Sequence, residues 1–429
     1  MINATRCLHT FHIPVMGTGF SIDTALRVAK YGISSVISLG DDILIEQMRK
    51  FHCKKTGEPY EKIAKSDEDA RARRITAYLN LVDRLVQQQV KTLQVSPFEK
   101  GSEITRYYEM LPDSNTKQMY QDMLEENNPD KKLSTQQCLR TLAIPGNIDV
   151  NIMVKADHVN YCRGNKLPAE FNDALAALRG YANSTLRSSI VFSAGINQHL
   201  YNYATEFGDF FSDKNGILKK KIILKVSDYR SAQVQAKFLA KKGLWVSEFR
   251  IESGLNCGGH AFASKGNLMG PILEEFKKNR VELIAMLHNI YSKALTTSGR
   301  TLNKIPHKVR ITAQGGIGTA AENELLLEYF DLDGTGWGTP FLLVPEVTNV
   351  DDIHLKKLSA ASDNDVYLSD SSPLGVPFWN LRSSASEEAR RQRIEKGKPG
   401  SSCPKGRLAF NTEFTKTPTC RASHAYQKL

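Results

Sequence analysis

The stretch Ile311-Thr312-Ala313-Gln314-Gly315-Gly316-Ile317-Gly318-Thr319 decides the fold. An apolar, β-prone run over residues 309–313 leads into its glycine-rich turn, and a helix-like segment follows over residues 320–330. A second glycine–threonine step, Gly338-Thr339, arrives about twenty residues later. Backbone amides at two consecutive strand ends can cradle a phosphate. In (β/α)8 barrels such a cradle is built from the loops after strands 7 and 8, so the stretch predicts this kind of barrel.

Strand-like and helix-like segments alternate on both sides of that stretch. The chain opens with a strand over residues 13–19, a short helix over 21–30 that Ser21 would cap, and a second strand over 32–40. Counting these two strands, which begin near residues 13 and 33, eight are expected, the others near residues 149, 190, 222, 245, 310 and 337. Eight strand–helix alternations favour a closed (β/α)8 TIM barrel over an open doubly wound sheet.

Two long additions accompany the predicted barrel. Residues 41–147 are charged and helix-prone, and within them residues 70–95 carry apolar side chains at three- and four-residue steps, which predicts a long helix. We interpret this region as a helical insertion after strand 2, acting either as a lid or substrate-selecting cap or as an oligomerisation element. The predicted organisation is barrel start, helical insertion or cap, remainder of the barrel and C-terminal extension, at residues 1–40, 41–147, 148–345 and 346–429.

Further helices are expected between and after the later strands. In the barrel they fall at residues 168–181 and 229–241 and begin again near residue 272. In the extension they fall at residues 351–361 and 387–396. The last predicted barrel strand runs over residues 335–343.

The composition suits a soluble, cytoplasmic globular protein. Of 429 residues, 41% are hydrophobic, and no apolar run approaches the roughly 20 residues of a membrane-spanning helix. The first twelve residues lack the apolar core of a signal peptide. The seven cysteines are scattered without a CxxC pair, which fits a reducing compartment.

The positive charge of the chain is concentrated in its tail. Net charge is +11, and residues 382–429 hold 11 Lys and Arg against 4 Asp and Glu, so they supply +7. Aromatic residues are sparsely interleaved with these charges, so we expect no nucleic-acid partner.

Six segments, in order, resemble those of the FMN-dependent nitronate monooxygenases, the 2-nitropropane dioxygenase group. They are also similar to those of the related flavin-dependent enoyl-ACP reductases. The segments cover residues 14–19, 32–40, 150–153, 254–260, 313–318 and 338–342. The resemblance implies that the barrel binds FMN and transfers electrons through it.

The resemblance also assigns cofactor-binding residues. It implies that the FMN phosphate lies on the glycine turns, and that the flavin ring lies against the loop after the first strand and near the ends of other strands. The phosphate residues would be Gly315, Gly316, Gly318, Gly338 and Thr339, and those near the ring Met16, Gly17, Thr18, Asn151, Lys225 and Gly259. Plainer alternatives are ordinary turn glycines, a capping or loop asparagine and a solvated lysine.

The catalytic residue implied by the resemblance is His260. A histidine can accept a proton from a carbon acid near neutral pH; the alternative is a histidine that hydrogen-bonds a loop. The family usually has Glu-Ala where this chain has Asn256-Cys257, so a carboxylate is missing and a thiol is added. Both residues are expected to shape the substrate pocket.

Cysteines of the tail suggest one further alternative. Cys257, Cys403 and Cys420, with Cys162 or His424, would suit an iron–sulfur cluster or zinc if the tail folded over the barrel mouth. The spacing between Cys403 and Cys420 matches no standard signature, so free structural thiols are favoured and no metal is expected.

These features predict an FMN-dependent oxidoreductase that oxidises a small carbon acid. One alternative is an enoyl-thioester reductase that binds NAD(P)H transiently, with the basic tail meeting an acidic acyl carrier protein or a coenzyme A phosphate. Another is a non-catalytic barrel that only binds flavin or phosphate, and a last one is a flavin-free phosphosugar isomerase. No membrane partner is expected, and a homodimer is left open.

Overall fold

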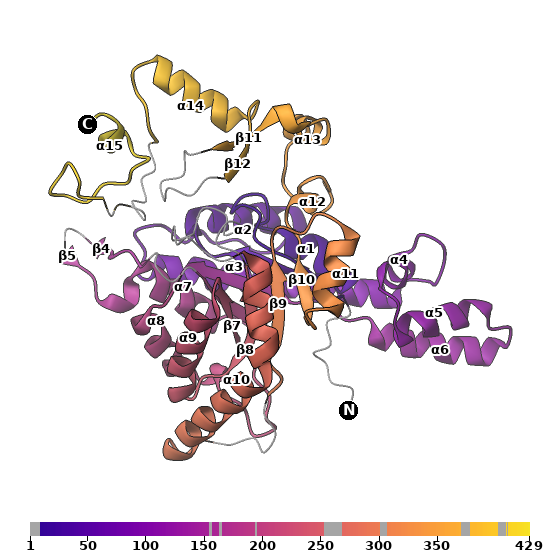
Figure 1. The fold of residues 1–429 in the computed structure, drawn as a ribbon. Coiled ribbons are helices and arrows are strands. Elements are labelled where there is room, and N and C mark those ends of the chain that lie inside the picture. Colours follow the sequence, from indigo (N-terminus) through magenta and orange to yellow (C-terminus); the bar gives the residue numbers. More distant parts are fainter. Residues whose placement is uncertain are drawn as a thin grey trace.

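The computed structural model describes residues 9–153, 157–162, 165–193, 195–252, 268–300, 307–369, 378–401, 409 and 411–429. Eight parallel strands close into a barrel, which Figure 1 shows with its surrounding helices. The order of the strands around the barrel is β1-β10-β9-β8-β7-β6-β3-β2. They are β1 (Phe11–Ile13), β2 (Ser34–Ser38), β3 (Ile148–Met153), β6 (Ser189–Ser193), β7 (Lys221–Val226), β8 (Val246–Ile251), β9 (Arg310–Gln314) and β10 (Gly334–Gly336). The predicted (β/α)8 barrel is confirmed, and all eight strands lie near their predicted positions, although β1 ends at Ile13, where the first strand was expected to begin.

Helices surround this barrel and bury its outer face. They are α1 (Thr24–Val28), α3 (Ala70–Val95), α7 (Asp173–Ala182), α8 (Gln198–Tyr203), α9 (Tyr229–Lys241), α10 (Met269–Thr297) and α11 (Ala320–Glu328). Successive side chains along each strand point alternately toward the surrounding helices and into the barrel. In β8, Phe249 and Ile251 join the apolar layer under the helices, whereas Glu248 and Arg250 point into the barrel and meet other strands.

Short 3-10 helices and a small hairpin complete the barrel region. These elements are η1 (Ala29–Tyr31), η2 (Ala169–Phe171), η3 (Ala204–Glu206), η4 (Gly208–Phe210) and the two-stranded β4 (Tyr161–Cys162) and β5 (Asn165–Lys166). The helix predicted over residues 168–181 is thus divided into η2 and α7, because Asn172 between them has extended backbone.

Two local predictions were wrong. Ser21 does not cap α1, which begins at Thr24; the Ser21 hydroxyl instead donates to the Gly17 carbonyl. The strand expected over residues 335–343 ends at Gly336, and residues 339–342 form the short helix α12 (Thr339–Leu342). Pro340 explains the change, since a proline in the first helical turn lacks only an N–H that the helix does not need, whereas a barrel strand needs it.

Helix α3 acts as the crossover between β2 and β3. At its start, Arg71 donates to the Leu39 carbonyl just beyond β2, and near its end Gln94 donates to the Ala143 carbonyl before β3. Its predicted apolar positions, Ile75, Leu79, Val82, Leu85 and Val86, are all buried in the main core. The long helix of the insertion is therefore part of the barrel wall.

The rest of the insertion divides between the two ends of the barrel. Helix α2 (Asp42–Thr56) follows β2 directly, whereas α4 (Glu103–Met110), α5 (Asn115–Glu125) and α6 (Pro129–Leu142) form a core of their own. Tyr107 of α4 donates to the Ile144 carbonyl and lies beside Gly32, so this group sits near the amino ends of β2 and β3. A lid over the mouth must be sought in α2 and residues 57–69. The domain division itself stays a prediction.

The C-terminal extension contains α13 (Asp352–Ser359), η5 (Asp363–Asp365), β11 (Val366–Ser369), β12 (Phe378–Leu381), α14 (Ala385–Glu395) and α15 (His424–Gln427). Strands β11 and β12 pair antiparallel. The extension starts against α1, where Thr24 donates to the Val347 carbonyl, and it is drawn on the same side of the barrel as α2 (Figure 1). No helix among the described residues is both long and apolar enough to cross a bilayer.

Candidate active site

The carboxyl ends of the eight strands open at one end of the barrel, where (β/α)8 enzymes carry their sites. Three predicted loops meet there. A Cβ added to Gly338 would lie 3.5 Å from Met16 Cγ, and the Gly315 amide donates to the Gly336 carbonyl at 3.3 Å. The loops after β1, β9 and β10 are therefore neighbours, as a shared ligand site requires. Gly17 and the half-buried Thr18 continue the first of these loops.

The turn after β9 has the conformation that its glycines allow. Gly315 and Gly316 have φ of 84° and 72°, in the left-handed region that favours glycine. The chain then enters α11 through a capping box. The Gly318 amide, the Thr319 amide and the Thr319 hydroxyl lie 2.8, 2.9 and 3.1 Å from one oxygen of Glu322. These amides lower the pKa of Glu322 by hydrogen bonding to its carboxylate. Three donors thus form an anion cradle that holds the protein's own carboxylate.

Asn151 and Thr339 occupy different settings. Asn151 belongs to β3, and its side-chain oxygen accepts a hydrogen bond of 3.0 Å from Ser193 of β6. It is therefore a barrel-interior residue held by the neighbouring strand. Thr339 begins the short helix α12, directly after Gly338.

Lys225 is held at the end of β7 by an interior network. Its ammonium lies 2.8 Å from one oxygen of Glu252, which directly follows β8, and Gln314 donates to the other oxygen at 2.9 Å. The Gln314 oxygen in turn lies 3.1 Å from His12 Nε2 on β1. Burial, together with nearby Arg250, lowers the pKa of His12 to about 3, so its ring is neutral. We call these four residues the interior chain.

A second charged group lies deeper in the barrel. Arg250 contacts Glu248 at 2.8 Å and Asp149 at 3.6 Å, and Thr312 donates to Glu248 at 2.7 Å. Burial opposes ionisation of Glu248, but Arg250 and Arg310 outweigh it and lower its pKa to about 2. Burial raises the pKa of Asp149, despite Arg250. The barrel interior therefore holds fixed charges where most barrels pack aliphatic side chains.

Two glycines of β10 leave room for these side chains. A Cβ on Gly336 would lie 2.5 Å from Gln314 Cβ and 2.6 Å from His12 Nε2. A Cβ on Gly334 would lie 2.6 Å from the Thr10 carbonyl oxygen and 3.2 Å from Arg310. Strand β10, which lies between β1 and β9, must therefore have glycine at the positions of its inner face.

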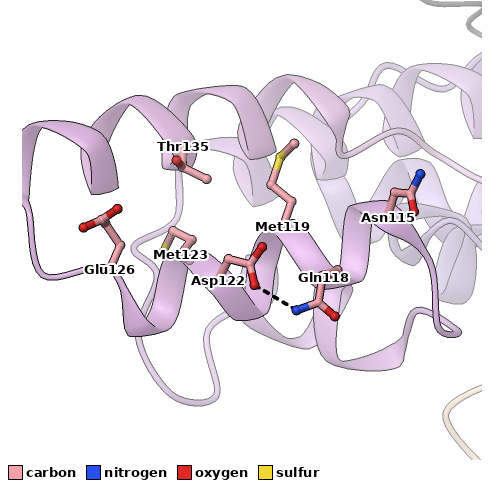
Figure 2. A pocket seen from close by; sticks show the side chains of 7 residues that line it. All are labelled: Asn115, Gln118, Met119, Asp122, Met123, Glu126 and Thr135. Atoms are coloured by element: carbon pink, nitrogen blue, oxygen red, sulfur yellow. Dashed lines mark hydrogen bonds between the residues drawn. The ribbon is translucent and has the colours of Figure 1, made fainter.

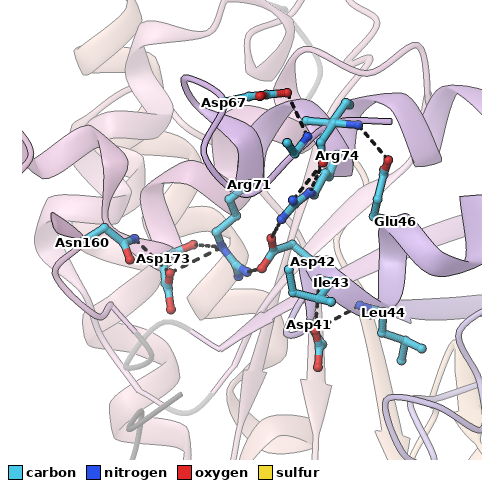
Figure 3. Close-up of polar contacts among 12 residues, drawn as sticks. Asp41, Asp42, Ile43, Leu44, Glu46, Asp67, Arg71, Arg74, Asn160 and Asp173 are labelled. Atoms are coloured by element: carbon cyan, nitrogen blue, oxygen red, sulfur yellow. Dashed lines mark hydrogen bonds and ion pairs between the residues drawn. The ribbon is translucent and has the colours of Figure 1, made fainter. Parts of the chain in front are cut away.

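Arginines of α3 fix the rim beside β2 and β3 (Figure 3). The Asp42 carboxylate forms ion pairs with Arg71 at 2.7 Å and with Arg74 at 2.8 Å. Arg71 also lies 3.8 Å from the Asp173 carboxylate. Arg74 additionally donates to the Ile63 carbonyl, which ties residues 57–69 down. All these side chains satisfy one another, so we assign them a structural role.

Several predicted site residues lie outside the described residues. Residues 253–267, which follow β8 in the sequence, include His260 and Gly259 and the predicted pocket residues Asn256 and Cys257. Cys403 also falls outside them, so the cysteine cluster and its alternative stay predictions. Cys420 is a half-buried free thiol, and the described part of the chain contains no group of three residues placed to hold a metal.

Sequence reasoning missed His12, Glu252 and Glu322 as members of the site. Polar residues at every second position of β8, ending in Glu252, were the available signal for an inward-facing charged row. The spacing Thr319-x-x-Glu322 was the available signal for the capping box. Gln314 was part of the decisive stretch, but its side chain was not assigned a role.

A groove lies far from this mouth. It has a volume of about 380 Å³ and lies between α5 and α6 (Figure 2). Its lining residues are Asn115, Gln118, Met119, Asp122, Met123, Glu126 and Thr135. It contains none of the predicted site residues.

Comparisons with known proteins add little to this picture. No family model and no curated protein matches the chain. The crystal structure of the enoyl reductase domain of MlnA, from the macrolactin biosynthesis cluster of Bacillus amyloliquefaciens, is similar at a TM-score of 0.37 and 15% identity. The match covers 63% of this chain and 64% of that one, which is less than two thirds of that domain. So distant a likeness carries no argument about activity, and the barrel assignment depends on the strand pairing alone.

Proposed function

We propose that this protein is an FMN-dependent oxidoreductase that oxidises a small carbon acid, in the manner of the nitronate monooxygenases. The observation that carries the proposal is the anion cradle after β9, where three donors converge on one Glu322 oxygen. The cradle lies beside the loops after β1 and β10, so one ligand can reach all three.

The donor set fits a phosphate. Backbone amides and a hydroxyl at a helix start bind anions generally, and a carboxylate already takes this place. Since the Glu322 side chain is exposed, it can leave the cradle without opening a cavity in the core. The residues that would hold the phosphate are Gly318 and Thr319 of the cradle, together with the predicted Gly315, Gly316, Gly338 and Thr339.

The remaining groups suit the rest of the cofactor and its substrate. Met16, Gly17 and Thr18 would border the flavin, Asn151 and Lys225 would approach it from strand ends, and Gly259 is predicted to join them from the segment that follows β8 in the sequence. When bound, FMN supplies the two-electron acceptor that the side chains lack. His260 is assigned the role of general base that takes the substrate proton, and Asn256 and Cys257 the shape of the pocket.

The redox partner is tested by two anaerobic reactions of FMN-loaded protein. Reduction by a simple alkyl nitronate, without bleaching by NADPH, supports the monooxygenase. Bleaching by NADPH without reaction with nitronate would replace it by the reductase alternative. Reduction by neither reagent would favour the non-catalytic barrel.

The role of His260 needs its own control. A His260→Asn variant is expected to bind FMN with unchanged affinity and to lose about 10²–10⁴-fold in turnover, the usual contribution of a general base. Wild-type turnover with bound flavin would remove His260 from the mechanism.

A further inference from the structure

We propose that His12, Gln314 and Glu252 position the ammonium of Lys225 as a fixed cation at the floor of the barrel mouth, where it binds the negatively charged part of the bound ligand. Under the proposed function that part is the ring of reduced FMN, so the ligand identity depends on that function. His12, Gln314 and Glu252 are positioning residues, and Lys225 is the group that contacts the ligand.

The geometry gives each member of the interior chain one task. A neutral His12 donates its Nε2 proton to the Gln314 oxygen, 3.1 Å away. That bond turns the Gln314 amide so that its nitrogen donates to Glu252 at 2.9 Å. Glu252 then has one oxygen left for Lys225 at 2.8 Å. Every bond runs in a single direction, toward the carboxylate that holds the cation.

The position of Lys225 at one end of the interior chain points to a ligand. Its side chain is 11% exposed and that of Glu252 only 4%, so Lys225 is the more exposed member of this ion pair. Lys225 is the second-to-last residue of β7 and Gln314 the last residue of β9. Both strands end at the mouth of the barrel, so the Lys225 end of the interior chain faces the place where a ligand would lie.

A purely stabilising role explains the arrangement poorly. Desolvation of a buried ion pair offsets much of its attraction, and apolar residues of similar volume are often as stable. Here the fold also gives up an inner side chain at Gly336, which makes room for His12 and Gln314. Such an arrangement is better explained by a requirement to hold charge in one place than by stability.

The first test needs no flavin. Acetylation of lysines by a limiting acylating reagent is followed by mass spectrometry, with the 70% exposed Lys278 as internal reference. Gln314→Leu and Glu252→Gln are each expected to raise the relative rate at Lys225 by about tenfold, the effect of losing one hydrogen bond to a charged group.

Gln235→Leu is the matched control. Gln235 is a buried amide of α9 that accepts from Tyr201 and donates to Ser231, but it lies outside the interior chain. The substitution is the same, and it should leave Lys225 at its wild-type rate. Equal rates at Lys225 in wild type and Gln314→Leu would overturn the positioning role, as would an equal rise in the control.

The second test measures the affinities of the protein for oxidised and reduced FMN. Lys225→Met should shift their ratio about tenfold toward oxidised FMN, which is roughly 30 mV for a two-electron couple. Gln314→Leu should shift it in the same direction, and Lys225→Arg should restore part of it. An unshifted ratio in Lys225→Met overturns the inference while leaving the proposed function intact. Failure of wild type to bind FMN removes the proposed function and with it the flavin assignment, and the acetylation rates then decide the positioning of Lys225.

Discussion

Replacing Gly336 by alanine tests the packing that shapes the barrel interior. The new Cβ would lie 2.5 Å from Gln314 Cβ, 2.6 Å from His12 Nε2 and 2.7 Å from His12 Cε1. The Gln314 Cβ is fixed to its strand and cannot turn away. The His12 ring is buried, so it can move only by giving up its bond to Gln314.

The expected cost combines two effects. Overpacking a dense interior costs about 1–3 kcal/mol. Leaving buried polar groups unpaired costs about 1–3 kcal/mol more. Gly336→Ala should therefore lower the free energy of unfolding by about 2–6 kcal/mol and should raise the acetylation rate of Lys225 as Gln314→Leu does.

Urea unfolding followed by fluorescence measures this loss in the free energy of unfolding. The control is Gly270→Ala in α10, where a Cβ meets no atom within 4 Å. It should be neutral or stabilise by up to about 1 kcal/mol, the helix propensity of alanine over glycine. If Gly336→Ala unfolded at the same urea concentration as this control, His12 and Gln314 could not be packed against β10 as described.

Three further outcomes are expected. Glu322→Gln should tighten FMN binding severalfold in a fluorescence titration, because it removes the competing negative charge from the cradle; weaker binding would contradict a phosphate there. The pKa of His12 is depressed in the folded state, so the unfolded chain takes up more protons below pH about 6.5, and stability should fall as pH drops from there toward 3. His12→Gln should flatten this dependence in urea unfolding at each pH, and an unchanged slope would exclude a buried neutral His12. Lys220→Met should destabilise by about 3 kcal/mol or more in the same assay, because the buried ammonium donates to three carbonyls around the end of α7, including that of Ser184; a change under 1 kcal/mol would contradict that role.

The barrel could be predicted because its signals are local. Strands such as β6 and β7 contain apolar runs, and the helices α3 and α9 begin and end at the predicted residues. The prediction of where β10 ends was wrong for an equally local reason. Residues 337–343 are apolar enough for a strand, but Pro340 lacks the N–H that pairing requires.

The interior chain could not be predicted in the same way. His12, Glu252 and Gln314 are far apart in sequence and meet only because the barrel closes β1 against β10, which pairs in turn with β9 and so brings β8 near. Alternation shows which side chains point inward, but pairing also depends on strand register and on the missing side chain of Gly336. The loop glycines were predictable because backbone conformation restricts residue type directly.

The most direct test of the account is whether the purified protein binds FMN. We predict a two-band flavin spectrum and release of one FMN per chain on heating, with binding restored when the released protein is titrated with FMN. A colourless protein whose fluorescence does not respond to saturating FMN would contradict the proposed function and leave the barrel without its assigned cofactor.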